Sequence, residues 1–283
     1  MSRGRKGRLC PSARSSALRQ NQICLIVLLL VEWQTGGSQH CSRRFRARGG
    51  WLDDGLLCIL QPPGSKQNRN LCAMQHNSVD DVLEAVRRVE ISERTIVAIA
   101  GPPGSGKSTI AARIVDELNS TERGSAAVLG MDGFHYDDLV LNERGWRARK
   151  GAPETFDVAG LEHLLARLRN NSEQEIAVPV FDRALEISRA GALIIPRSTR
   201  FVIVEGNYLL LRQVPWTNLL RYYDMTVFLQ VEERVLRERL EMRWRLFGFN
   251  NEEVQAKVVQ NDLPNALLVT SQSQSPDFLI RST

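Results

Sequence analysis

The chain has 283 residues, enough for one large domain or for a domain with an appendage, and its net charge of +5 is unevenly spread. Of the 37 basic and 32 acidic residues, residues 1–73 hold twelve and three, which leaves 25 and 29, a net charge of −4, for the rest. All five cysteines also lie in residues 1–73, so residues 74–283 can form neither a disulfide nor a thiolate metal site. This body suits a reducing compartment, and we expect it to be cytoplasmic.

The first 73 residues lack the pattern of a folded domain. Their nine-residue apolar run, 23–31, is shorter than the roughly 20 residues that cross a bilayer, so we expect no stable membrane insertion. An Arg- and Ser-rich start without acidic residues before Glu32 resembles an organellar transit peptide, which would make the location organellar. A secretory signal and a true translation start at Met74, with a non-native upstream segment, are the open alternatives.

The basic residues 1–73 are the candidate nucleic-acid-binding segment of the chain. The alternative is a solvated tail, because charge runs of this kind are more often solvated. The body, at −4, offers no basic excess, so we expect no nucleic acid to bind there.

From residue 74 onward, apolar runs of strand length alternate with amphipathic segments of helix length, which is typical of a parallel sheet covered by helices. The predicted helices are 78–89, 107–118, 158–168 and 232–247. The predicted strands are 95–100, 126–132, 176–181, 200–206 and 225–231, with 192–196 as a candidate hairpin partner of 176–181. The fold class is therefore α/β, a doubly wound and mostly parallel sheet with helices on both faces.

The segment "GPPGSGKST", residues 101–109, matches the pattern G-x-x-x-x-G-K-[ST]. It lies between a predicted strand and a predicted helix, where backbone N–H groups and a helix N-terminus converge on an anion. Lys107 supplies a charge toward the β- and γ-phosphates, and the Ser108 hydroxyl can bind Mg²⁺. The motif predicts a P-loop NTPase that binds ATP. The candidate nucleotide-binding residues are Gly101, Gly104, Ser105, Gly106, Lys107, Ser108 and Thr109.

Glu205 ends the predicted strand 200–206 and is the candidate partner of Ser108 in holding Mg²⁺. The alternative is an ordinary solvated glutamate at a strand end. A zinc centre is excluded, because the body has no cysteine and only three histidines. A regulatory GTPase is disfavoured, because neither Lys150 nor Lys257 lies in an N-K-x-D element, which reads guanine.

Asp132, in "MDGFHYDD", ends the strand that follows the phosphate loop, and ligands of α/β sheets gather at such carboxyl ends. A carboxylate there can take the proton of an acceptor hydroxyl as it attacks the γ-phosphorus. Direct ligation of Mg²⁺ by Asp132 is the alternative. His135 and Tyr136 either line the acceptor pocket or are ordinary loop residues.

The predicted helix 232–247 is rich in arginine and carries Arg239 and Arg243 one turn apart on one face. Arginine suits phosphoryl transfer, because its planar and permanently charged guanidinium binds the phosphoryl oxygens bidentately. The segment is therefore a candidate helical lid. The four glutamates of the same segment would give these arginines ordinary surface partners instead. The candidate catalytic residues are Lys107, Asp132, Arg239 and Arg243.

Residues 90–270 resemble the P-loop small-molecule kinases, the family of uridine kinase, phosphoribulokinase and bacterial pantothenate kinase. The resemblance rests on the phosphate loop, "MDGFHYDD", "GAPETFD" (151–157), "VPVFDR" (178–183), "VEGNYLLL" (204–211) and the Arg-rich helix. It implies transfer of the ATP γ-phosphate, with Mg²⁺, to a hydroxyl of a nucleoside, a sugar or a pantothenate-like acid. The resemblance implies acceptor contacts at Asp157, Asp182, Arg183 and Arg189, which join the candidates His135 and Tyr136.

The chain departs from uridine kinases at Gly133, where they have serine, and at Asn207–Tyr208, which replace an apolar pair. With "NDLPNA" (261–266), these residues are most similar to a subgroup described as fructose-transport-associated or nucleoside/nucleotide kinase-like proteins. The acceptor stays open, and so does the oligomeric state, with a homodimer among the alternatives. The competing function is a regulatory nucleotide-binding ATPase without a small-molecule acceptor.

Overall fold

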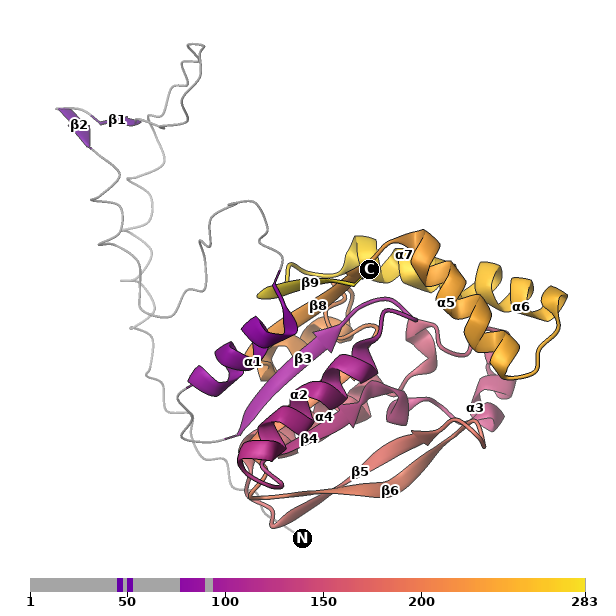
Figure 1. Cartoon of the computed structure of the whole chain (residues 1–283), viewed down its shortest axis with the longest axis horizontal. Coiled ribbons are helices and arrows are strands. Elements are labelled where there is room, and N and C mark those ends of the chain that lie inside the picture. Colours follow the sequence, from indigo (N-terminus) through magenta and orange to yellow (C-terminus); the bar gives the residue numbers. More distant parts are fainter. Residues whose placement is uncertain (1–44, 48–49, 53–76, 90–93, 283) are drawn as a thin grey trace, which may run out of the picture. The chain divides into compact units, whose positions relative to one another are not determined.

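The computed structural model describes residues 45–47, 50–52, 77–89 and 94–282, and the chain divides into two units, residues 1–69 and 70–283 (Figure 1). In the first unit it describes an antiparallel pair of short strands, β1 (Phe45–Ala47) and β2 (Gly50–Leu52). The cysteines and the apolar run 23–31 lie outside the described residues, so the alternatives for residues 1–73 stay predictions. Among the described helices, none is long and apolar enough to cross a bilayer.

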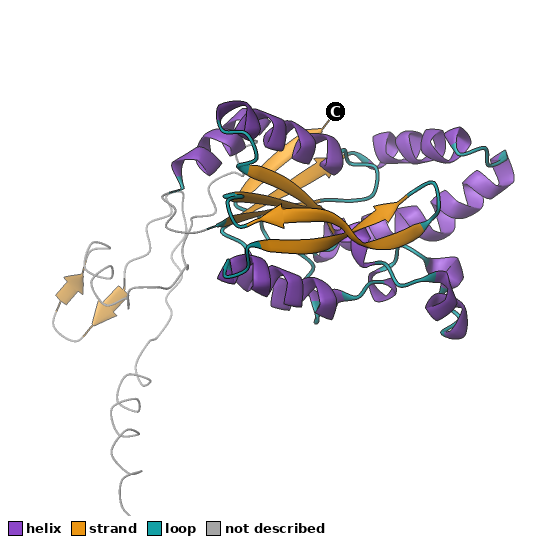
Figure 2. Cartoon of the chain, turned by 90° about the horizontal axis from the view of Figure 1, so that it is seen from below, coloured by secondary structure: helices purple, strands orange, loops and turns teal. Residues whose placement is uncertain are grey.

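The second unit is built on a five-stranded sheet whose pairings are all parallel. In spatial order the strands are β4 (Ala126–Gly130), β7 (Phe201–Gly206), β3 (Thr95–Ala100), β8 (Met225–Val231) and β9 (Phe278–Ser282). The central strand β3 is buried along its whole length, as expected for a sheet with helices on both faces (Figure 2). The predicted α/β fold class is confirmed.

Two hydrophobic cores lie on opposite faces of the sheet, because successive side chains of a strand point to opposite sides. Val97 and Ile99 of β3 pack with α1 (Val79–Arg88) and α2 (Lys107–Thr121). Ile96 and Ala98 face the other core, which contains the apolar stripe of α4 (Val158–Asn170). Ser78 and Asp81 form a capping box that starts α1 at the predicted position.

A separate antiparallel hairpin extends the second core. Its strands are β5 (Glu175–Asp182) and β6 (Ile187–Pro196), which includes the predicted partner segment 192–196. The buried guanidinium of Arg94 holds the base of this hairpin. It donates to the main-chain oxygens of Thr199 at 2.8 Å, of Pro196 at 2.7 Å and of Leu168 at 3.2 Å.

The predicted Arg-rich helix is α5 (Glu233–Leu246), and it packs with α6 (Asn251–Lys257). A π-helical turn, Val258–Asp262, then leads directly into α7 (Leu263–Gln272). Buried side chains of these helices form a small core of their own, made by Leu236, Leu240, Val254, Val258 and Ala266. The short helix α3 (Asp138–Glu143), which the sequence did not indicate, begins at the cap residue Asp137.

Candidate active site

Three strand ends meet at one edge of the sheet and carry the predicted functional residues. The register pairs Ala100 of β3 with Gly206 of β7, and Gly130 of β4 with Glu205 of β7, so the three strands end level. The phosphate loop follows β3 and Asp132 follows β4, while Glu205 belongs to β7 itself. The parallel sheet thus brings residues about 25 to 100 positions apart in the chain to one place, as expected for the carboxyl edge of an open α/β sheet.

The phosphate loop ends at Gly106, whose φ of +91° is accessible to glycine at little cost. The helix α2 begins at the next residue, Lys107, and presents its N-terminal N–H groups to the cleft. The Lys107 side chain is buried, and its Nζ donates to the main-chain oxygen of Pro102 at 2.9 Å. Burial lowers the pKa of Lys107 to about 8, because desolvation outweighs the attraction of Glu205 and Asp132. A bound polyphosphate would favour the charged ammonium.

Ser108 and Glu205 face one another across the start of α2. The Ser108 Oγ donates to Oε1 of Glu205 at 3.2 Å. Burial raises the pKa of Glu205, while the positive charge of Lys107 opposes this shift. A hydroxyl and a carboxylate beside a phosphate site are hard oxygen donors of the kind that hold Mg²⁺ together with substrate phosphates, so this pair fits the ion. Among the described residues, no cluster of three or more His, Cys, Asp or Glu side chains forms a complete protein metal site.

The strand β4 ends at Gly130, two residues before the predicted end at residue 132. Asp132 therefore lies in the 3₁₀ turn that follows, Met131–Phe134. Gly133 explains this turn. A Cβ on Gly133 would lie 2.5 Å from the main-chain oxygen of Pro179 in β5, so only glycine allows the turn to pack on that strand. The glycine that distinguishes this chain from uridine kinases is thus required by packing next to Asp132.

The Asp132 carboxylate forms an ion pair with Arg183, which extends from the β5–β6 turn. The main-chain oxygen of Asp132 lies 2.8 Å from Nδ1 of His135, which must carry the proton, because a carbonyl only accepts. The His135 ring packs between Phe156 and Phe181, with centroid distances of 4.1 and 4.8 Å. Burial lowers the pKa of His135, so the ring is neutral near pH 7.

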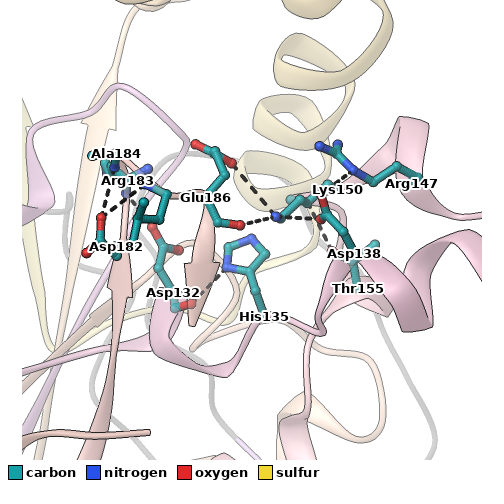
Figure 3. Close-up of polar contacts among 12 residues, drawn as sticks. Asp132, His135, Asp138, Arg147, Lys150, Thr155, Asp182, Arg183, Ala184 and Glu186 are labelled. Atoms are coloured by element: carbon teal, nitrogen blue, oxygen red, sulfur yellow. Dashed lines mark hydrogen bonds and ion pairs between the residues drawn. The ribbon is translucent and has the colours of Figure 1, made fainter. Parts of the chain in front are cut away.

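A charged network lies close to Asp132 and His135 (Figure 3). Lys150 donates from Nζ to Oδ1 of Asp138 and to the main-chain oxygen of Glu186, each at 2.7 Å, and its side chain is only 9% exposed. Arg147 binds the other oxygen of Asp138 at 2.7 Å. The buried Tyr208 hydroxyl donates to the main-chain oxygen of Gly151 at 2.6 Å and so holds the turn that carries Lys150.

On the other side of the cleft, α5 and the π-helical turn meet. The indole Nε1 of Trp244 donates to Oδ2 of Asp262 at 2.6 Å, and Nη2 of Arg243 lies 3.6 Å from Oδ1 of the same carboxylate. Burial raises the pKa of Asp262, while the Trp244 hydrogen bond and the Arg243 charge oppose the shift. Arg239 instead contacts the back of the phosphate loop, with Nη1 3.5 Å from the main-chain oxygen of Gly104.

Most of these groups, but not Asp138, Tyr208 and Arg239, line one cleft of about 740 Å³. Basic side chains outnumber acidic ones in its lining, as suits a polyanionic ligand. The predicted residues that line it are Gly104, Gly106, Lys107, Ser108, Thr109, Asp132, His135, Arg183, Glu205 and Arg243. The predicted residues outside the lining are Gly101, Ser105, Tyr136, Asp157, Asp182, Arg189 and Arg239.

The predicted acceptor contacts outside the lining make local interactions. Asp157 is the N-cap of α4 and accepts from the Gly160 N–H at 2.9 Å. Asp182 accepts from two N–H groups of the hairpin turn at 3.1 Å and pairs with Arg189 at 3.3 Å. The Tyr136 ring packs under the Arg144 guanidinium, 4.7 Å from its centroid. These side chains have local partners in the structure, and their predicted contact with an acceptor stays a prediction.

The sequence did not single out several residues that line the cleft. They are Arg147, Lys150, Glu186, Asn207, Trp244, Lys257, Asn261 and Asp262. Asn207, Asn261 and Asp262 lie in quoted segments of the family resemblance, which offered a signal without a role. Lys150 and Glu186 carried no signal, because their meeting depends on the tertiary packing of two separate turns.

The comparisons with known proteins agree with this site. A model of the phosphoribulokinase / uridine kinase family matches residues 96–281. A Schizosaccharomyces pombe protein, provisionally named a uridine kinase, is 34% identical over 206 residues, which cover 70% of this chain and 87% of that protein. The pantothenate kinase of Myxococcus xanthus is 31% identical over 162 residues, 54% of this chain and 49% of that enzyme.

A solved structure gives the same result. The crystal structure of a kinase from Silicibacter sp. TM1040, provisionally assigned to a fructose transport system, has a TM-score of 0.67 and 35% sequence identity. The match covers 72% of this chain and 98% of that one. The predicted resemblance is therefore confirmed, and the chain belongs to the phosphoribulokinase / uridine kinase family of P-loop kinases that act on small molecules.

Proposed function

We propose that this protein is an ATP- and Mg²⁺-dependent kinase that transfers the γ-phosphate to a hydroxyl group of a small polar metabolite. The observation that carries the proposal is the meeting of the phosphate loop, the Ser108–Glu205 pair and Asp132 at level strand ends. Family membership supports the class of reaction. The kinase domain in this proposal is residues 74–283, and residues 1–73 are an extension without a part in the chemistry.

The donor binds at the phosphate loop. The N–H groups of the loop and of the first turn of α2 bind the phosphate oxygens, and Lys107 leaves the Pro102 carbonyl for the β- and γ-phosphates. Ser108 and Glu205 would hold Mg²⁺, which would supply positive charge to neutralise the phosphates. Arg239 fixes α5 against the loop, and Arg243 faces the transferred group from the opposite wall.

Asp132 acts as the base. An acceptor hydroxyl oxygen attacks the γ-phosphorus and forms the new P–O bond, and its proton passes to the Asp132 carboxylate. The bond between the γ-phosphorus and the β,γ-bridging oxygen breaks, and its electron pair leaves with ADP. Arg183 pairs with the Asp132 carboxylate and orients it toward the cleft until the acceptor binds.

The acceptor class in this proposal is a nucleoside, a sugar or a pantothenate-like acid. His135, Phe156 and Phe181 offer an aromatic wall, and Lys150 and Arg147 offer donors for hydroxyl or carboxylate oxygens. This mixture of flat apolar and charged groups is suited to any of the three classes, so the acceptor must be identified by assay.

The test is ADP release by the full-length protein with ATP and Mg²⁺ across a panel of sugars, nucleosides and pantothenate. We expect one class to stimulate release, and we expect Lys107→Ala to abolish it. Tight ATP binding without stimulation by any acceptor would instead favour the regulatory nucleotide-binding function.

A further inference from the structure

The segment "NDLPNA" (261–266) overlaps the end of a π-helical turn that has no part in the proposed roles. The helix from Asn251 to Gln272 contains a π-helical turn at Val258–Asp262, which ends immediately before Leu263 and Pro264. Proline has no N–H to donate within a helix, and its ring crowds the carbonyl four residues earlier, here that of Gln260. A wider turn relieves this crowding and inserts one extra residue into the helix.

The wider turn brings three successive polar residues, Gln260, Asn261 and Asp262, to the lining of the cleft. Asn261 and Asp262 both line it, although the side chain of Asp262 is only 8% exposed. Asn261 donates from Nδ2 to the main-chain oxygen of Lys150 at 3.0 Å and accepts from Asn265 at 3.2 Å. Asn261 thus attaches the turn to the loop that carries Lys150.

The last polar residue of the turn, Asp262, binds α5. Its Oδ2 accepts from Trp244 at 2.6 Å, which leaves Oδ1 directed to the Arg243 guanidinium at 3.6 Å. The Nε of Arg243 is buried and, within the described part of the chain, has no hydrogen-bond partner. An arginine side chain has many rotamers, so a buried carboxylate beside it, itself fixed by the indole, restricts where the guanidinium can lie.

We propose that Asp262 is a positioning residue that, fixed by Trp244 and the π-helical turn, holds the Arg243 guanidinium toward the γ-phosphate. The inference rests on the proposed function only for the direction of Arg243. Arg243, Lys107 and Asp132 line the same cleft, so the guanidinium shares the space that the transferred group would occupy. Asp262 itself touches neither nucleotide nor acceptor in this scheme.

Asp262→Asn is the main test, because the amide oxygen can still accept from Trp244 while the charge beside Arg243 is lost. The first readout is the ratio of the dissociation constants of ADP and of a non-hydrolysable ATP analogue, measured by calorimetry on the full-length protein. The wild type is expected to prefer the analogue, and the variant to lose most of that preference while its affinity for ADP changes less than about threefold. This readout needs no acceptor.

The second readout is the acceptor-dependent rate. Misplacement of one group by about 1 Å can cost about 10²-fold, so Asp262→Asn should lower kcat by about 10- to 100-fold with little change in the KM for ATP. Asp262→Glu restores the charge and should recover part of the loss. Asp224→Asn is the matched control, because Asp224 is also a partly buried, ion-paired aspartate but precedes β8 at the opposite edge of the sheet.

A double-mutant cycle tests whether Asp262 acts through Arg243. In an Arg243→Ala background, Asp262→Asn should change neither the binding ratio nor kcat further. Additive losses, or an Asp262→Asn variant with the wild-type binding ratio, would overturn the positioning role. A wild type that binds both nucleotides but responds to no acceptor would refute the proposed kinase function, while the binding cycle would still decide the role of Asp262.

Discussion

Replacement of Asp132 by asparagine separates the proposed base from a structural carboxylate. The amide keeps the shape of the side chain but cannot take a proton from the acceptor. Loss of a general base costs about 10²- to 10⁴-fold in rate, which corresponds to about 3 to 5 kcal/mol of transition-state stabilisation. The predicted defect is therefore in kcat, with ATP binding preserved.

The structure gives a small expected effect of the same change on stability. Asp132 is paired with Arg183, whose side chain is 55% exposed, and a solvent-screened pair of this kind contributes at most about 1 kcal/mol. The Asp132 main-chain oxygen keeps its contact with His135 in the variant. We therefore expect a large loss of rate with little loss of folding free energy.

The assay is acceptor-dependent ADP release at saturating ATP, combined with urea unfolding of the same samples. Asp116→Asn is the matched control, because it makes the same chemical change on the exposed face of α2, and it should keep the wild-type kcat. An Asp132→Asn variant with a near-normal rate would refute the base role. A fall in unfolding free energy of several kcal/mol would show that the pair with Arg183 is structural.

Two further predictions concern buried rings. Tyr208→Phe leaves the Gly151 carbonyl without its 2.6 Å partner, so it should lower the urea-unfolding free energy by about 1 to 3 kcal/mol and raise the KM for the acceptor. Tyr223→Phe removes a buried hydroxyl that has no hydrogen-bond partner in the described part of the chain, so it should be neutral or stabilising. Equal effects of the two changes on the unfolding free energy would contradict this reasoning. Burial lowers the pKa of His135 in the folded state. As the pH falls below about 6.5, His135 is therefore protonated in the unfolded state before it is protonated in the folded state. The unfolding free energy that the neutral buried ring contributes at higher pH is lost as the pH falls through the folded-state pKa. His135→Gln should therefore reduce the slope of unfolding free energy against pH in that range, by up to about 1.4 kcal/mol per pH unit, and an unchanged slope would show that His135 is not its source.

Much of the fold could be predicted because local patterns and global packing agree. The strand 95–100 is β-branched and runs into glycines, and the structure places β3 at those residues in the centre of the sheet. The sequence could not give the order of the strands, in which β7 lies between β3 and β4 although it follows them in the chain. The fifth strand, β9, carried too short an apolar run to be recognised.

The candidate site was predictable where chemistry follows a strand end, as it does for Lys107, Asp132 and Glu205. Other contacts depend on tertiary packing, which the sequence does not encode. Asp182 has the expected sequence context but is engaged by the N–H groups of its own turn. Lys150, in contrast, reaches the cleft only because Asp138 and Glu186 converge on its ammonium group.

Arg243 and Arg239, on one helix, also differ in contacts that depend on packing. Their spacing of four residues predicted a shared face, and α5 confirms that both belong to one helix. Arg243 lines the cleft, whereas Arg239 contacts the back of the phosphate loop and Ser282 of β9. The packing of α5 against the phosphate loop and β9, which no sequence pattern encodes, gives the two arginines different contacts.

The most direct test of the account is whether a small hydroxyl compound accelerates ADP release by the full-length protein in the presence of ATP and Mg²⁺. The account predicts that one class among sugars, nucleosides and pantothenate accelerates release, and that Lys107→Ala and Asp132→Asn each remove the acceleration. Release that no acceptor accelerates, from a protein shown by calorimetry to bind ATP, would contradict the kinase function.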